Sequence, residues 1–242
     1  MQQQRRLGRG TWIAAGSPVV TEVVSQMGFD WLLFDLEHGN MTDADLQNNI
    51  RAVCDSVKVI VRVGEYHPAF IGRILDWGAA GIMIPHVSCA KEAQRVVRGI
   101  CYPPCGVRGF SSSSRSFGYG AWAPRDLSSL AQPLFLAQIE SYEGVMHADE
   151  IARTPGVDML FVGPRDLGLD LSVRPSGNTL AFDDALQRVA EAALGGGIQA
   201  GILVRDNGDL PKLQRLGYTS LAMGSDLGAL RLGYKQILQS LG

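Results

Sequence analysis

The sequence predicts a single (β/α)8 (TIM) barrel, and three observations support this fold class. Short apolar runs alternate with longer amphipathic segments, as in proteins whose parallel strands are joined by helices. Eight such apolar runs are present, and each precedes a connection long enough to cross over to the next strand. A length of 242 residues is usual for one barrel of this kind. We therefore expect residues 1–242 to form one domain.

A doubly wound open sheet is the alternative fold, because it shows the same alternation of strands and helices. Its dinucleotide-binding members carry a GxGxxG turn after an early strand, and no early strand of this sequence is followed by that pattern. The closed barrel is therefore favoured over the open sheet.

The second apolar run, WLLFDLE, illustrates how the strands are identified. Five of its first six residues are apolar, which suits a strand buried on both faces. Such a run ends in Glu37 and His38, two ionisable groups that a strand interior cannot hold unpaired at low cost. We therefore expect this strand to deliver them to a rim. The eight expected strands are 11–16, 31–37, 58–63, 80–87, 134–140, 158–164, 198–204 and 218–224.

Capping signals mark several helices between these strands. Ser17 followed by Pro18 is typical of a helix start, with a capping side chain and then proline at the first helical position. Gly78 is typical of a helix end. The expected helices begin at Ser17, run from Thr42 to about Cys54, and cover 67–78, 88–100 and 227–242.

The alternation is interrupted once, by residues 101–124. This segment is rich in Gly, Pro, Ser and Arg and has no apolar period. A loop of this length inside a compact chain is usually functional or disordered. The sequence leaves its role open.

Composition and charge exclude several classes of function. The chain is 46% hydrophobic with a net charge of −2, and no basic block suggests nucleic acid or an anionic membrane surface as a partner. The four cysteines include one CxxxC pair and no second pair that would complete a zinc site. No apolar run approaches membrane-spanning length and the N-terminus lacks a signal-peptide core, so we expect a cytoplasmic protein.

Polar side chains gather at the expected carboxyl ends of the strands, where barrel enzymes place their catalytic groups. Salt bridges at the barrel mouth are the alternative explanation, but a histidine, an arginine and at least three carboxylates on one rim favour a site. The residues concerned are Glu37, His38, Arg62, Pro85, His86, Gln138, Glu140, Gly163 to Asp166, and Gly224 to Asp226.

These residue types point to chemistry on a small acid. Carboxylates without a His or Cys partner at ligand spacing are hard oxygen donors that suit Mg²⁺ or Mn²⁺ with several waters retained. Such a metal polarises a carbonyl group. An arginine can stabilise a developing enolate oxygen, and a histidine can move a proton near neutral pH. Together they suit carbon–carbon bond chemistry at a 2-oxo acid.

Six motifs in register resemble the HpcH/HpaI family of class II (metal-dependent) pyruvate aldolases. The resemblance extends from about Thr11 to the GSD at 224–226, which is nearly the whole chain. Each motif alone is weak, and the set in this order is specific to the family. The motifs are FDLEHG, VIVRV, LDWGAAGIMIPHV, YPPCGVRG, QIES and VGPRDL.

The resemblance implies a metal and substrate site on two strand ends. Glu140 and Asp166 would hold a divalent cation, Mg²⁺, Mn²⁺ or Co²⁺. Gln138 would contact the bound 2-oxo acid. Gly163, Pro164 and the amides that follow, beginning with Arg165, would receive the pyruvate carboxylate.

The resemblance also assigns the catalytic groups and the assembly. Arg62 would stabilise the enolate oxygen, and His38 would be the acid/base, oriented by Asp76. Glu37 is expected to support the site without reacting. Family members are typically homo-hexamers, dimers of trimers that exchange the last helix. We interpret His67 and His86 as structural and Asp226 as a cap of the last helix.

Three departures from the family pattern concern the second substrate. Gly39-Asn40 stands where the family more often has serine-proline, and Arg165 stands where a small residue is usual. The segment 109–120, GFSSSSRSFGYG, also differs from the better-known aldolases. We expect all three to lie where the aldehyde binds, and Arg108, Arg115 and Arg165 hint at an anionic tail on it.

The implied function is the reversible cleavage of a 4-hydroxy-2-oxo acid to pyruvate and an aldehyde, through a pyruvate enolate held at the metal. The alternatives are a member of the citrate-synthase or CoA-ester lyase type and a barrel that only binds a small acid. Chain length argues against CoA esters, and the presence of Glu140, Asp166, Arg62 and His38 argues against loss of catalysis.

Overall fold

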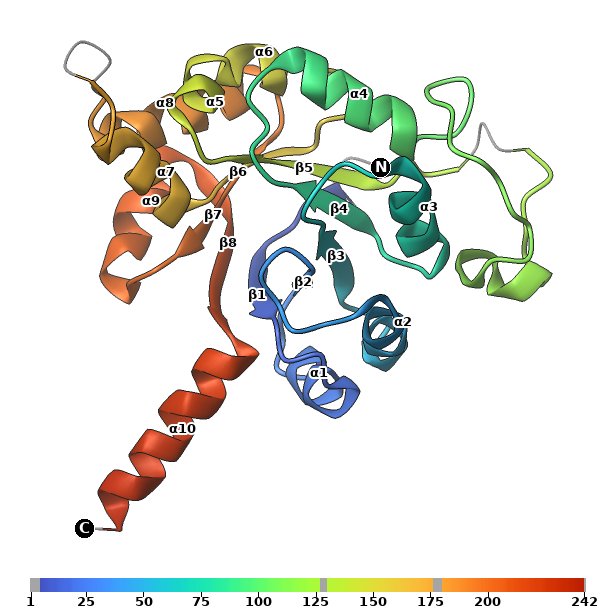
Figure 1. The fold of residues 1–242 in the computed structure, drawn as a ribbon, viewed down its shortest axis with the longest axis horizontal. Coiled ribbons are helices and arrows are strands. Elements are labelled where there is room, and N and C mark those ends of the chain that lie inside the picture. Colours follow the sequence, from blue (N-terminus) through green and yellow to red (C-terminus); the bar gives the residue numbers. More distant parts are fainter. Residues whose placement is uncertain (1–4, 127–129, 176–179, 242) are drawn as a thin grey trace.

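We describe the protein from a computed structural model, which covers residues 5–126, 130–175 and 180–241. Eight parallel strands close into a barrel in which sequence neighbours pair and β8 closes on β1 (Figure 1). The predicted fold class is therefore confirmed. The strands are β1 (Arg9–Ile13), β2 (Trp31–Asp35), β3 (Lys58–Arg62), β4 (Gly81–Ile84), β5 (Leu134–Ile139), β6 (Met159–Val162), β7 (Gln199–Val204) and β8 (Tyr218–Ser225).

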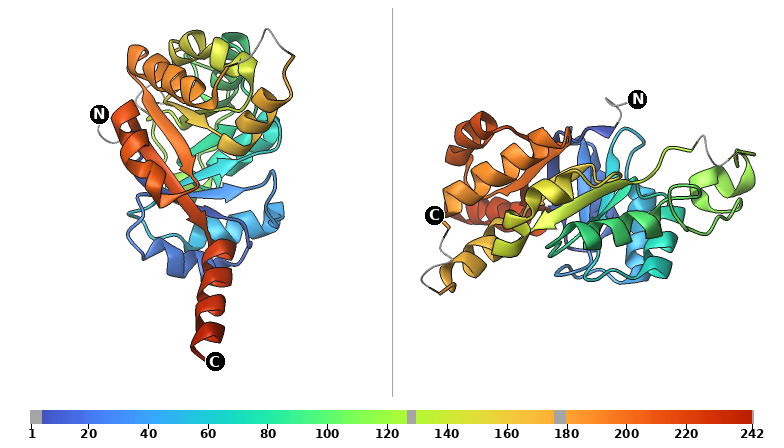
Figure 2. Two further views of the ribbon diagram at one scale, coloured as in Figure 1. Left: turned by 90° about the vertical axis from the view of Figure 1, so that its left-hand side faces the viewer. Right: turned by 90° about the horizontal axis from the view of Figure 1, so that it is seen from above.

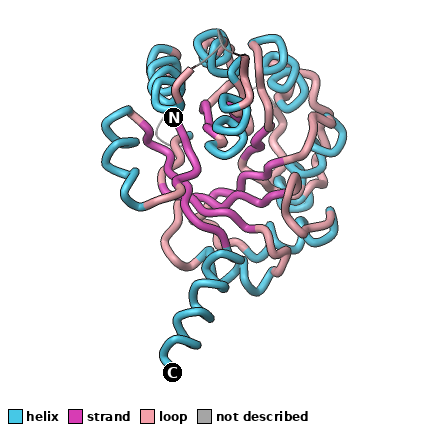
Figure 3. Tube along the Cα trace, turned by 60° about the vertical axis from the view of Figure 1, so that its left-hand side comes forward, coloured by secondary structure: helices cyan, strands magenta, loops and turns pink. Residues whose placement is uncertain are grey.

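Helices follow the strands and surround the barrel, as the views in Figures 2 and 3 show. Two short 3₁₀ helices, η2 (Arg115–Gly120) and η4 (Asn207–Asp209), lie in connections. The α-helices within the described residues are α1 (Pro18–Ser25), α2 (Asp43–Ala52), α3 (Pro68–Asp76), α4 (Ala90–Ile100), α5 (Tyr142–Met146), α6 (Ala148–Ala152), α7 (Pro164–Ser172), α8 (Phe182–Gly195), α9 (Leu210–Leu216) and α10 (Asp226–Ser240).

The strands bury side chains on both faces, as the continuous apolar runs predict. Trp31 and Leu33 of β2 belong to the cluster that fills the barrel, whereas Leu32 and Phe34 belong to the layer between barrel and helices. Inside the barrel, the ring centroids of Trp31 and Phe161 are 6.1 Å apart in an edge-on arrangement. Alternate residues of each strand therefore serve two cores.

Most strands are shorter than the apolar runs that predict them, although β8 extends one residue further, to Ser225. The second run was expected to cover 31–37, but β2 ends at Asp35, and Glu37 and His38 lie in the bend that follows. Likewise β1 covers Arg9–Ile13 where 11–16 was expected. The apolar pattern overshoots because residues just past a strand, such as Leu36, still pack against the core.

The capping signals are confirmed at two helix starts. The Ser17 hydroxyl accepts the Val20 N–H at the start of α1. At α2 the Thr42 hydroxyl accepts the Asp45 N–H, and the Asp45 carboxylate accepts the Thr42 N–H in return.

The long segment after α4 lies at the amino-terminal end of the barrel strands. α4 leaves the carboxyl end of β4 and runs back along the barrel, so the chain that joins it to β5 belongs to the opposite end. Figure 1 shows this segment extending outward beside α3. The expectation that it lies where the aldehyde binds is therefore wrong within one chain. The order of the expected elements, a helix at 88–100 before the segment and a strand at 134–140 after it, already implies this end of the barrel.

The terminal helix α10 projects away from the barrel (Figures 1 and 2). It carries many exposed apolar side chains, and three of them, Leu230, Tyr234 and Ile237, line an apolar groove of about 490 Å³ shared with α1. Such a large unpaired apolar surface is typical of an interface. The exposed apolar residues of this terminal segment are Leu227, Leu230, Leu232, Tyr234, Ile237, Leu238 and Leu241.

Within the described residues, no helix combines the length and the apolar character that a membrane span requires.

We expect α10 to be covered by another copy of the chain in solution. Introducing charge with Leu230→Glu and Ile237→Glu should abolish assembly, because both side chains line the groove with α1. Light scattering at micromolar concentration measures the change in mass. Leu194→Glu on α8, where the side chain is 81% exposed outside the groove, is the matched control and should assemble normally. A wild-type monomer at this concentration would contradict the prediction.

Candidate functional site

A buried ion pair joins the carboxyl ends of β2 and β3. Asp35 and Arg62 are paired in register and are only 4% and 7% exposed. Arg62 Nε donates to Asp35 Oδ1 at 3.0 Å, and Nη2 donates to Oδ2 at 2.7 Å. This two-pronged geometry fixes the plane of the guanidinium. Arg62 therefore lies at the rim, as the sequence predicts.

A second carboxylate completes the surroundings of Arg62. Glu37 Oε2 is 2.9 Å from Nη1, and the Trp12 ring lies 5.9 Å from the guanidinium carbon. Burial alone would lower the pKa of Arg62, but Asp35, and then Glu37 and Glu140, raise it on balance. The guanidinium is thus a fixed positive charge.

Asp35 is the residue of this site that sequence reasoning missed. Besides Arg62, its Oδ1 accepts the backbone N–H of Glu37 at 3.1 Å and of His38 at 3.3 Å. A Cβ at Gly39 would lie 2.1 Å from the Asp35 carbonyl oxygen, so only glycine allows this tight bend. The available signal was a carboxylate inside an otherwise apolar strand.

Gln138 and Glu140 meet at the end of β5. Gln138 Nε2 donates to Glu140 Oε1 at 2.7 Å, and the His86 N–H donates to Oε2 at 3.2 Å. Burial first, and then the charges of Asp166 and Glu37, raise the pKa of Glu140 to about 7 against the opposing effect of His86. The negative charge of the ionised Glu140 carboxylate is thus poorly neutralised by the surrounding protein.

The turn into α7 brings Gly163 and Asp166 next to Glu140. Gly163 is the residue before the helix, Pro164 is its first residue and Asp166 lies in its first turn. A Cβ at Gly163 would lie 2.2 Å from Glu140 Oε1, so the glycine leaves room for this carboxylate. Arg165 is exposed on the same turn.

These residues fit a divalent cation. Gln138 Oε1 is buried without a hydrogen-bond partner, and it belongs to the same side chain that binds Glu140. Buried oxygen donors without protons to share are what a hard cation requires. No group of three or more His, Cys, Asp or Glu side chains among the described residues is arranged to hold a metal. A cation at Glu140 and Asp166 would therefore take most of its ligands from water and substrate.

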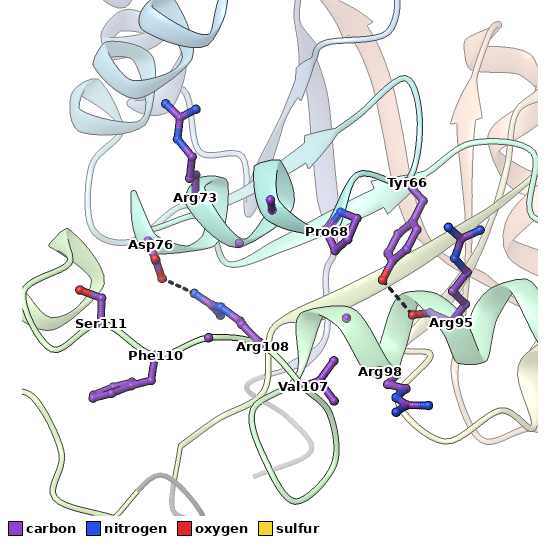
Figure 4. Close-up of a pocket in the computed structure, with 14 residues that line it drawn as sticks. Tyr66, Pro68, Arg73, Asp76, Arg95, Arg98, Val107, Arg108, Phe110 and Ser111 are labelled. Atoms are coloured by element: carbon purple, nitrogen blue, oxygen red, sulfur yellow. Dashed lines mark hydrogen bonds and ion pairs between the residues drawn. The ribbon is translucent and has the colours of Figure 1, made fainter.

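His38 and Asp76 do not meet within the chain. The His38 side chain is 70% exposed, and its Nε2 is 4.0 Å from Glu37 Oε2. Asp76 ends α3 at the opposite end of the barrel, where it accepts a hydrogen bond from Arg108 Nη2 at 2.6 Å (Figure 4). The expectation that Asp76 orients His38 is not met in one chain, because α3 runs away from the rim.

Two of the three arginines expected near the aldehyde are also bound at that far end. Arg108 pairs with Asp76 and lies 4.5 Å from the centre of the Tyr102 ring. Arg115 Nη1 donates to the Trp77 carbonyl oxygen at 2.9 Å, just past the end of α3. Of the three, only Arg165 lies on the rim of its own chain.

Two smaller expectations are resolved by the structure. His67 is structural, since its Nδ1 accepts the Phe70 N–H at the start of α3. The cap of α10 is Ser225, whose hydroxyl accepts the Gly228 N–H. Asp226 instead accepts the N–H groups of its neighbour Leu227 and of the loop after β1.

The fold and the rim define a (β/α)8 barrel with a candidate active site rich in carboxylates at the strand carboxyl ends. The model of the HpcH/HpaI aldolase/citrate lyase family matches residues 9–232. The chain belongs to this family.

Individual relatives agree with this assignment. The chain is 33% identical over 239 residues to a hydroxypyruvate/pyruvate aldolase of Paraburkholderia phytofirmans, covering 96% of this chain and 92% of the relative. It is 37% identical over 223 residues to a 5-keto-4-deoxy-D-glucarate aldolase of Shigella boydii, covering 92% and 87%.

Solved structures of the family show the same fold. An HpcH/HpaI aldolase/citrate lyase family protein from Burkholderia cenocepacia superposes with a TM-score of 0.87 at 31% identity, covering 99% of this chain and 98% of the other. The citrate synthase SbnG superposes with a TM-score of 0.82 at 26% identity, covering 98% and 94%.

Glu140 should make the metal-free protein less stable as the pH rises. Its folded pKa of about 7 lies above the ordinary 4.5, so the folded state holds the proton more tightly and the free energy of unfolding falls between about pH 5 and pH 8. Glu140→Gln has no carboxyl group to titrate here and so should not lose stability in this way. The free energy of unfolding of the variant minus that of wild type should therefore increase by up to about 3 kcal/mol from pH 5 to pH 8. Urea unfolding in EDTA at both pH values measures the difference. Glu22→Gln, on the exposed face of α1, is the control, and a pH-independent difference for Glu140→Gln would contradict the prediction.

Proposed function

We propose that the protein is a carbon–carbon lyase, a metal-dependent aldolase that reversibly cleaves a 4-hydroxy-2-oxo acid to pyruvate and an aldehyde. The observation that carries the proposal is one rim with a buried arginine held by Asp35 and Glu37 beside the under-compensated carboxyl of Glu140. The aldolase names of the relatives support the same reaction class.

The metal belongs to Glu140 and Asp166 in this proposal. Mg²⁺, Mn²⁺ or Co²⁺ bound there would act as a Lewis acid toward the 2-oxo group of the substrate. Gln138, whose buried Oε1 has no hydrogen-bond partner, would orient the acid. The turn at Gly163 and Pro164, and the backbone N–H groups that follow it from Arg165 onward, would receive the substrate carboxylate at the positive end of the helix.

The charge that develops on the substrate oxygen is stabilised by Arg62. Its guanidinium cannot rotate, because Asp35 holds two of its nitrogens and Glu37 the third. A donor that is fixed before reaction costs no reorganisation when charge develops. In the cleavage direction this charge forms as the carbon–carbon bond breaks.

Proton transfer falls to His38. Its exposed imidazole stands at the rim, where it would take the proton from the 4-hydroxyl group as the aldehyde forms. Within the chain the acidic group beside it is Glu37, at 4.0 Å. The assembly that we propose is a homo-hexamer, a dimer of trimers built through α10.

Removal of the metal should abolish activity. A site with oxygen donors only should lose its cation to EDTA, and pyruvate release from a panel of 4-hydroxy-2-oxo acids should stop. Mg²⁺, Mn²⁺ or Co²⁺ should restore it. A dialysed, metal-free enzyme that kept its full rate would contradict the roles of Glu140 and Asp166. No pyruvate from any member of the panel would favour the citrate-synthase or binding alternatives.

Oxaloacetate decarboxylation separates the roles of Arg62 and His38, because it builds the same enolate charge without deprotonating a substrate hydroxyl. Arg62→Ala should lower both activities by about 10²-fold or more. His38→Ala should lower aldol cleavage by roughly 10²–10⁴-fold and decarboxylation much less.

Both rates are measured on both variants, with circular dichroism to confirm folding. Since Arg62→Ala leaves Asp35 buried without its partner, Arg62→Lys provides a second variant that keeps a positive charge. An equal loss of both activities in His38→Ala would show that His38 serves binding rather than proton transfer.

A further inference from the structure

His86 holds an unusual backbone conformation at the rim. It follows the end of β4 and has a φ of +53°, a value that only one other non-glycine residue shares in the described part of the chain, Tyr119. The turn is anchored on both sides, since the Val87 N–H donates to the Gln138 carbonyl oxygen at 3.1 Å and the Ser88 hydroxyl to that of His86 at 3.0 Å. Such conformations persist only where surrounding contacts enforce them.

Because of this turn, both the backbone N–H and the ring of His86 lie close to the Glu140 carboxylate. The His86 N–H donates to Glu140 Oε2 at 3.2 Å, and the ring Nδ1 lies 3.5 Å from the same oxygen. The other ring nitrogen, Nε2, is 4.0 Å from Glu37 Oε1. The imidazole itself is 64% exposed and thus spans two rim carboxylates from the solvent side.

We propose that His86 is a positioning residue for Glu140 and thereby sets the affinity of the site for divalent cations. This inference rests on the proposed function, in which Glu140 is a metal ligand. Gln138 holds one oxygen of the carboxylate and His86 the other, so the group is oriented before a cation arrives. Outer contacts of this kind typically change metal affinity by about 10–100-fold.

Three substitutions separate the ring from the backbone. His86→Gly removes the ring, and glycine adopts a positive φ freely, so the N–H to Glu140 is kept. His86→Asn also tolerates this conformation and places an amide nitrogen as many bonds from the backbone as Nδ1. His86→Ala lacks the ring and resists the positive φ, so both contacts are weakened.

Titration calorimetry with Mn²⁺, Mg²⁺ and Co²⁺, without substrate, measures the effect. We expect His86→Gly to weaken binding of all three metals by a similar factor of about 10 or more. His86→Asn should restore affinity to within about threefold of wild type, and His86→Ala should bind more weakly than His86→Gly. Thermal unfolding in EDTA should show no loss of stability for His86→Gly, which a merely structural histidine would not predict.

Tyr119→Gly is the matched control, because it removes an exposed ring at the other non-glycine residue with positive φ, remote from the rim. It should leave metal affinity unchanged. Wild-type affinity in His86→Gly would overturn the inference and leave the proposed function intact. A loss confined to Co²⁺ would also overturn it, since it would place the imidazole on the metal itself. Failure of the wild-type protein to bind any of the metals would overturn both proposals.

Discussion

The buried pair between Asp35 and Arg62 is the constraint on which the rim depends. Removing two such charges from water is costly, and the cost is offset only when the geometry is good and the remaining hydrogen-bonding groups are satisfied. Both conditions hold here. The Glu37 carboxylate pairs with the guanidinium nitrogen that Asp35 leaves free, and the Asp35 carboxylate also accepts two backbone N–H groups. The same carboxylate thus fixes the arginine and shapes the bend that carries His38.

The charge balance of this rim explains why it suits a cation. Arg62 is shared between Asp35 and Glu37, and within the described residues neither Glu140 nor Asp166 forms an ion pair with an arginine or a lysine. The pKa of Glu140, raised to about 7 with burial as the largest cause, reflects this lack of neutralising positive charge. A divalent ion would remove it. Arg62, already held by two carboxylates, is not free to turn and neutralise Glu140.

The sequence was sufficient for the fold and for most of the rim, since periodicity and strand ends are local properties. Arg62, Gln138 and Glu140 were found because they lie at or near the carboxyl ends of apolar runs, where barrel enzymes place their catalytic groups. Asp35 was missed because it lies inside such a run, where a charge becomes explicable only once its partner on β3 is known. The strained turn at His86 and the direction in which Asp76 points likewise depend on packing between elements distant in the sequence.

The terminal helix is tied to the same rim. Asp226, the first residue of α10, is 3% exposed, and its carboxylate accepts the N–H groups of Ala14 and Ala15 at 3.0 and 2.9 Å. The Ala14 carbonyl oxygen in turn accepts the backbone N–H of Asn40 at 2.9 Å, two residues after His38. The Asp226 carboxylate at the start of α10 therefore also holds the loop after β1, and this loop in turn binds the bend that carries His38. One set of hydrogen bonds thus links the start of α10 to the bend that carries His38.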